Sequence, residues 1–123
     1  MTRDTPQRRA IRRAVESAGR PLSPQEILTA ARREHGSLGL ATVYRTVKSG
    51  VEAGWLQPVE LPGEPLHYEL AGKRHHHHFS CRGCGRVFDV PGCPGDLDRL
   101  APPGFELESH DLVLYGRCVR CRR

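Results

Sequence analysis

The sequence lacks any run of about 18 apolar residues, the length that a helix needs to cross a bilayer. The opening segment MTRDTP also lacks the apolar core of a secretory signal. We therefore expect a cytoplasmic protein without a membrane segment. Thiols stay reduced in that compartment, so C-x-x-C motifs are expected to hold metal or do redox work rather than form structural disulfides.

Apolar residues are scarce. They make up 37% of 123 residues, which is little for a chain that builds one ordinary domain or two small ones. Small units with small cores usually need a metal ion or a partner subunit. We therefore expect the chain to bind a metal ion or a partner subunit.

Acidic residues are in deficit where the chain begins. Residues 1–53 carry ten basic and five acidic side chains, and residues 72–123 carry nine basic and six acidic ones. The larger positive excess belongs to the N-terminal part, as a phosphate-binding surface requires.

Three short helices are predicted in this basic part. Apolar residues recur at helical spacing over 7–18. A second helix begins after Ser23 as N-cap, with Pro24 in its first position and Glu26 completing a capping box, and we expect it to end near His35. A third helix begins in LATVYRTVKSGVEAGWL, where one stripe is apolar: Leu40, Val43, Val47 and Val51.

A β-hairpin is predicted next, from the apolar runs 55–60 and 66–70 around the turn PGEP. Three helices and a hairpin are the parts of a winged helix-turn-helix. Its third helix would occupy the position that enters a DNA major groove. An exposed Tyr-Arg pair is usually plain surface, but here it suits base edges, with a nearby lysine for phosphate. The candidate DNA-binding residues are Thr42, Tyr44, Arg45 and Lys48.

The composition changes at Ala71-Gly72-Lys73-Arg74, where we place a domain boundary between 1–71 and 72–123. Histidine, cysteine and short β-like runs follow. We expect a short helix at 96–101 and strands at 77–81, 86–90, 105–108 and 111–117.

Two C-x-x-C pairs lie in this second part, Cys81 with Cys84 and Cys118 with Cys121. Zinc takes four tetrahedral ligands, and two such pairs supply a closed structural site. The site would join the end of the chain to the start of its second part. The alternative is two independent redox motifs or accidental cysteines.

Four consecutive histidines precede the first pair. Side chains alternate faces along a strand, so His75 and His77 point one way while His76 and His78 point the other. One run therefore serves two metal sites. Each needs further ligands from elsewhere; the candidates are Glu69, Asp89, Cys93 and His110.

Nearly the whole chain resembles the ferric uptake regulator family of metal-sensing repressors. The resemblance rests on PQR, GLATVYR, HHHHF-x-C-x-x-C-G and the closing H-x-L-x-L-Y-G-x-C-x-x-C. It implies an α+β (α/β) homodimer, with an N-terminal winged helix-turn-helix and a small C-terminal α/β dimerisation domain that zinc staples. It also implies a repressor of metal-uptake genes that binds an operator in double-stranded DNA. Neither catalysis nor a small-molecule substrate is expected.

The resemblance also implies roles for individual residues. Structural zinc is held by Cys81, Cys84, Cys118 and Cys121. A regulatory ion at the hinge is held by Glu69, His76, His78 and Asp89. A further site takes His75, His77 and His110, with Cys93 about where the family has a glutamate. Tyr44 and Arg45 match the DNA-reading pair. One hinge ion would tie both domains together, so that two recognition helices meet major-groove faces about 34 Å apart.

Some positions depart from the family pattern. The histidine that iron and peroxide sensors place before the second helix is missing from GRPL at 19–22. This disfavours a peroxide sensor. A thiolate at Cys93 favours zinc over ferrous iron, unless Cys93 is a plain buried thiol. The cysteine that zinc sensors often place before the histidines is missing too, and His67 or Glu60 would have to replace it. We predict a zinc-responsive repressor, with iron or manganese as the alternative ion.

Two other classes remain. A zinc-dependent hydrolase would need an open metal position and a nearby base such as Glu69, but no H-E-x-x-H motif is present. A zinc-stapled RNA-binding module is the other. Gel shifts on duplex DNA with and without metal separate these classes.

Overall fold

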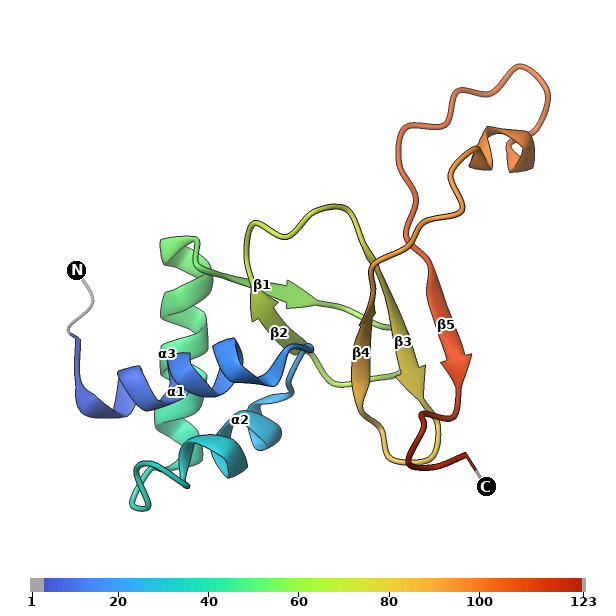
Figure 1. The fold of residues 1–123 in the computed structure, drawn as a ribbon. Helices are drawn as coiled ribbons and strands as arrows, with labels where there is room; N and C mark the ends of the chain where they lie inside the picture. The colour runs from blue at the N-terminus through green and yellow to red at the C-terminus, as the bar shows by residue number, and fades with distance from the viewer. Residues whose placement is uncertain (1–3, 123) are drawn as a thin grey trace. The chain divides into compact units, whose positions relative to one another are not determined.

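The computed structural model describes residues 4–122 (Figure 1). Residues 1–3, part of the opening segment expected not to be a secretory signal, lie outside that range, as does residue 123. The described chain divides into two compact units, one up to Lys73 and one from Arg74. Within the described residues, no helix has both the length and the apolar character to cross a membrane.

The first unit holds three helices and a two-stranded sheet: α1 (Pro6–Ala18), α2 (Pro24–Ala31), α3 (Leu40–Ala53), β1 (Leu56–Val59) and β2 (His67–Leu70). The second unit is mainly strands: β3 (His77–Cys81), β4 (Val87–Val90), the 3₁₀ helix η1 (Leu97–Leu100) and β5 (Val113–Gly116). This content confirms the predicted α+β class.

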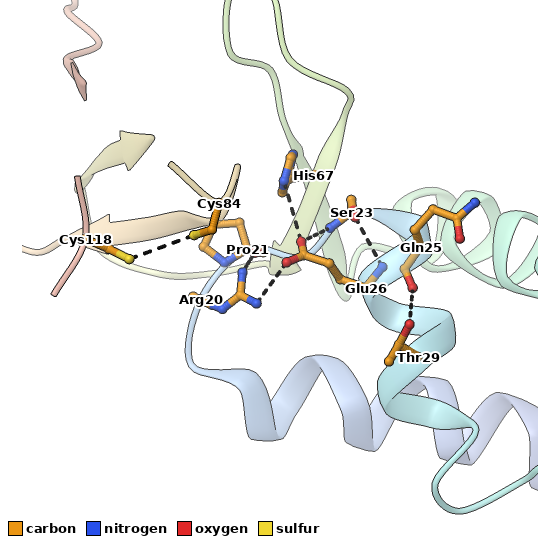
Figure 2. Close-up of polar contacts among 9 residues, drawn as sticks. All are labelled: Arg20, Pro21, Ser23, Gln25, Glu26, Thr29, His67, Cys84 and Cys118. Atoms are coloured by element: carbon orange, nitrogen blue, oxygen red, sulfur yellow. Dashed lines mark hydrogen bonds and ion pairs between the residues drawn. The ribbon is translucent and has the colours of Figure 1, made fainter. Parts of the chain in front are cut away.

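Helix α2 begins as its capping box predicts. Ser23 Oγ accepts from the Glu26 amide at 3.2 Å, and Glu26 Oε1 accepts from the Ser23 amide at 3.0 Å (Figure 2). Two orphan amides at the helix start are thereby satisfied. The predicted end near His35 is wrong. The helix ends at Ala31 because the following amides bond as turns, Arg33 N–H to Ala30 O for example.

The core of the first unit lies where its helices and hairpin meet. Helix α3 buries Val43 and Val47, and the apolar stripe predicted there faces inward. Strands β1 and β2 pair antiparallel, with Leu56 opposite Leu70. The core cluster is Ala10, Ile11, Val15, Leu22, Ile27, Leu28, Ala31, Leu38, Val43, Val47 and Leu56. The opposite face of α3 stays exposed.

The second unit is built on a three-stranded sheet of order β4-β3-β5 (Figure 1). Strand β3 pairs antiparallel with β4 and parallel with β5. The chain between β4 and β5 forms a long excursion beyond the sheet. The strand predicted at 105–108 is wrong, because that segment pairs with no described strand. The predicted helix at 96–101 shortens to the single 3₁₀ turn η1, with Pro102-Pro103 following.

The second unit has little core of its own. Among its described residues, only Cys81 and Val87 are buried apolar side chains. Several large apolar side chains are exposed instead: Leu100, Phe105, Leu107, Leu114, Tyr115 and Val119. Apolar burial alone contributes about 25 cal/mol for each Å² removed from water, so this unit gains little from it. We therefore expect metal ligation or a partner surface to contribute much of its stability.

Candidate metal centres

The four paired cysteines meet at one end of the second unit's sheet. Strand β3 ends at Cys81, and its parallel pairing with β5 sets Cys81 opposite Gly116, just before Cys118. Their four sulfur atoms all lie within 4.8 Å of one another. The sulfurs of Cys84 and Cys118 are 3.8 Å apart (Figure 2). Tetrahedral zinc with bonds of about 2.3 Å separates its sulfurs by about 3.8 Å, so the cysteines fit zinc.

Backbone amides surround the buried Cys81 sulfur. It accepts from the amides of Cys118 and Gly83, each at 3.3 Å. Amide donation, first from Cys118, lowers the pKa of Cys81 to about 6 and so favours the thiolate. The neighbouring Cys81 sulfur and then burial, in contrast, raise the pKa of Cys121. Zinc binding would therefore release a proton from Cys121.

Gly83 lies inside the first cysteine turn, and a methyl group there would lie 2.8 Å from both Cβ and Sγ of Cys121. Both contacts are too short to be accommodated without moving Cys121. We expect Gly83→Ala to weaken zinc retention by about tenfold or more, measured as the rate of zinc loss to a chelator. Gly92→Ala is the control, because nothing lies within 4 Å of its added methyl. Equal zinc loss from both variants would contradict this prediction.

A second cluster lies across strands β3 and β4, which pair His78 with Asp89. Asp89 Oδ1 lies 3.6 Å from His76 Nε2 and 3.7 Å from His78 Nε2. These separations are long for hydrogen bonds. They are close to the roughly 3.4 Å between two tetrahedral ligands bonded at about 2.05 Å. His76 Nδ1 donates to Arg74 O at 2.7 Å, which leaves Nε2 as the ligand atom.

Glu69, the fourth predicted hinge ligand, belongs to β2 in the first unit. Its side chain is 1% exposed. Gln57 Nε2 donates to Glu69 Oε2 at 2.6 Å, and Lys73 Nζ lies 3.4 Å from Oε1. The sequence reasoning missed both contacts. The hairpin register places Gln57 opposite Glu69, which would have identified the first contact.

A third cluster joins His75, His77, Cys93 and His110, with ligand atoms within 4.8 Å of one another. His110 Nε2 lies 3.1 Å from His75 Nε2 and 3.2 Å from Cys93 Sγ. Cys93 is exposed, so the alternative that it is a plain buried thiol is wrong. Three imidazoles and one thiol are a donor set that suits zinc.

His77 differs from the other members of this cluster. Burial and then His75 lower the pKa of His77, which favours the neutral ring. Its Nδ1 accepts from the Leu112 amide at 3.1 Å, so the neutral ring carries its proton on Nε2. A cation bound through Nε2 would shift this proton to Nδ1, where it would face the Leu112 amide proton. The Leu112 amide would therefore have to move.

The two proposed substitutes for a missing hinge ligand lie in none of the three clusters found among the described residues. His67 is buried, and its Nδ1 donates to Pro65 O at 2.8 Å. Its Nε2 lies 3.7 Å from Glu26 Oε1 (Figure 2). Glu60 is exposed on the hairpin. His67 thus joins β2 to the start of α2.

The four predicted DNA-binding residues all lie on α3. Tyr44 is 52% exposed, and Arg45 and Lys48 are exposed as well. Thr42 is half-buried, and its Oγ1 accepts from Arg45 Nη2 at 3.0 Å. That contact holds the Arg45 guanidinium on the exposed face.

A model of the ferric uptake regulator family matches residues 1–115. The chain belongs to this family. Ferric uptake regulator proteins are metal-responsive transcriptional regulators, and the chain is therefore a regulator and not an enzyme. The hydrolase alternative is wrong.

Several ferric uptake regulator relatives are similar over most of the chain. The ferric uptake regulation protein of Bordetella parapertussis is 36% identical over 85% of this chain and 77% of its own. The zinc uptake regulation protein of Mycobacterium tuberculosis is 33% identical over 98% and 95%. A solved structure of a zinc-bound manganese uptake regulator has a TM-score of 0.85 at 30% identity, covering 96% of this chain and 92% of its own.

Proposed function

We propose that this protein is a zinc-responsive repressor of metal-uptake genes. The observation that carries the choice of zinc is Cys93, whose exposed thiol meets three histidines in the third cluster. A thiolate favours zinc over ferrous iron or manganese. Similarity to the zinc uptake regulation protein of Mycobacterium tuberculosis supports the same choice.

The four paired cysteines hold a structural zinc ion in this proposal. Their sulfur separations support tetrahedral ligation, and the poor core of the second unit supports a need for it. This ion stays bound and leaves regulation to the hinge cluster, with the third cluster as a second regulatory site.

Sensing is assigned to the hinge ligands, where Glu69 joins His76, His78 and Asp89. Support comes from the family resemblance, from the clustered second-unit ligands and from a buried carboxylate on the first unit. An ion held by both units restricts their relative motion, which sets the spacing of the two recognition helices in a dimer. A few kcal/mol of differential metal affinity is enough for such a coupling.

The second copy of the chain is expected at β5. That strand lies at the edge of its sheet, and its Leu114 and Tyr115 are 48% and 41% exposed. Edge strands with apolar side chains invite pairing with another chain. A homodimer would bury them and present two α3 helices to a pseudo-palindromic operator.

An iron- or manganese-responsive regulator is the second candidate. The hinge ligands offer only nitrogen and oxygen atoms, a set that these ions also accept. Metal analysis of the purified protein, followed by operator titrations at buffered free zinc, iron and manganese, distinguishes the candidates. We expect zinc to activate DNA binding at the lowest free concentration. Activation by iron or manganese alone would reject the zinc assignment.

Arg45→Ala tests the DNA-reading face. We expect a loss of about 1–3 kcal/mol in operator binding and relaxed preference at one base pair, because a bidentate base contact is removed. Binding to a panel of single-base operator variants measures both effects. Lys48→Ala is the comparison. It should weaken binding to all duplexes equally and reduce the slope of log affinity against log salt concentration by about 1. If Arg45→Ala also weakens binding to every duplex in the panel equally, Arg45 contacts phosphate and does not read bases.

A further inference from the structure

The buried carboxylate of Glu69 already has partners inside its own unit. Placing a carboxylate at 1% exposure costs several kcal/mol unless it is paired. Gln57 donates to one oxygen at 2.6 Å. The Lys73 ammonium lies 3.4 Å from the other. Both oxygens of a proposed metal ligand are therefore engaged by neighbouring side chains.

The chain is bent so that Lys73 reaches Glu69. In a straight strand, residues four apart are separated by about 13 Å. Here β2 ends at Leu70, and the next amide, of Ala71, bonds to Trp55 O at 3.0 Å. Gly72 then adopts a left-handed φ of 86°, which glycine tolerates best. The turn brings the Lys73 side chain back to the carboxylate that a straight strand would leave behind.

We propose that Lys73 competes with the regulatory metal ion for Glu69, an inference that rests on the proposed function of the hinge ligands. Without the ion, the ammonium neutralises the buried carboxylate. With the ion bound, the ammonium leaves the carboxylate oxygen. The Lys73 side chain is 29% exposed, and its long aliphatic stem lets the charged end move into water. Competition of this kind weakens metal binding and raises the free-metal concentration at which the regulator responds.

Gln57 has a different role from Lys73 at this carboxylate. Its amide is neutral, and cross-strand pairing fixes it opposite Glu69. It can keep holding one carboxylate oxygen while the other binds metal, as supporting residues do in metal sites. Lys73 is therefore the residue that sets the threshold, and Gln57 positions the ligand.

The test is a zinc titration of the dimer, already loaded with its structural zinc, against a chromophoric chelator. Lys73→Met removes the charge and keeps the bulk, and Lys73→Arg keeps a charge. Arg74→Met removes a charge from the next residue. Glu69→Gln should lose or weaken one zinc-binding step, which identifies that step as binding at the hinge ligands. We expect Lys73→Met to bind zinc about tenfold tighter at that step, and Lys73→Arg and Arg74→Met to match the wild type. If Lys73→Met folds poorly, Lys73→Gln replaces it in the titration and is expected to give the same result.

Thermal unfolding supplies a second readout. Lys73→Met removes the ammonium beside the buried Glu69 carboxylate. The unfolding midpoint of this variant should therefore lie below that of the wild type before hinge zinc is added and match it afterwards. Unchanged or weaker zinc binding in Lys73→Met overturns the inference, as does equal tightening in Arg74→Met. A different outcome rejects the proposed function of the hinge ligands: a Glu69→Gln variant in which every zinc-binding step is unchanged.

Discussion

Replacing Cys81 with serine is expected to remove the structural zinc and unfold the second unit. Cys81 is the buried member of the four, and amide donation lowers its pKa to about 6, so it would anchor the ion as a thiolate. Structural zinc contributes roughly 10–16 kcal/mol of apparent binding energy in small zinc domains. The second unit has only Cys81 and Val87 as buried apolar residues within the described chain. Among the described residues, the apolar core of this unit therefore contributes far less stability than a bound zinc ion would.

Zinc content and thermal unfolding of the Cys81→Ser variant measure this effect. Cys93→Ser is the comparison: it removes an exposed thiol outside the four, so any zinc that it loses belongs to the third cluster, while the cysteine-bound ion and the unfolding transition should remain. The first unit should stay folded in both, because its core is separate. A Cys81→Ser protein that has no bound zinc but unfolds at the wild-type temperature would refute the structural role.

The double variant His76→Ala, His78→Ala is expected to abolish metal-dependent operator binding while leaving a folded dimer. Both imidazoles face Asp89 Oδ1, at 3.6 and 3.7 Å, and removing them leaves too few donors to hold an ion. At saturating metal, operator affinity should fall to the metal-free value, a loss of about 5- to 150-fold for a coupling of 1–3 kcal/mol.

The control for this variant is His35→Ala. His35 contacts Ser37 in the first unit and lies in none of the three clusters. It should respond to metal like the wild type. Zinc content should fall in the double variant by the hinge ion alone, with the cysteine-bound ion retained. A variant that lacks both histidines and still gains operator affinity with metal would exclude the hinge cluster as the sensor.

Local chemistry made much of the fold predictable. The Ser23–Glu26 capping box started α2 as expected, because both hydrogen bonds are set within one turn. Strand alternation separated His75 and His77 from His76 and His78, and the two clusters that contain histidines follow that division. The two cysteine pairs met because each lies at the end of a strand in one sheet.

Longer-range features were less accessible. The strand expected at 105–108 failed because a strand needs a hydrogen-bonded neighbour, which an apolar run such as Phe105–Leu107 does not specify. The Lys73 contact depends on the left-handed turn at Gly72, and no periodicity reports it. Burial of Cys93 was also open in the sequence, since a lone cysteine is compatible with a core or a surface. These features depend on where segments distant in sequence finally lie.

The most direct measurement compares one dimer in two states on one duplex. The operator is selected from random duplexes with metal-loaded protein, and its affinity is then measured for the loaded dimer and for a dimer stripped of hinge metal but retaining the cysteine-bound zinc. We predict tight, salt-sensitive binding by the loaded dimer and a loss of about 5- to 150-fold on stripping. Equal affinity in the two states would contradict the claim that a hinge-bound cation controls DNA recognition.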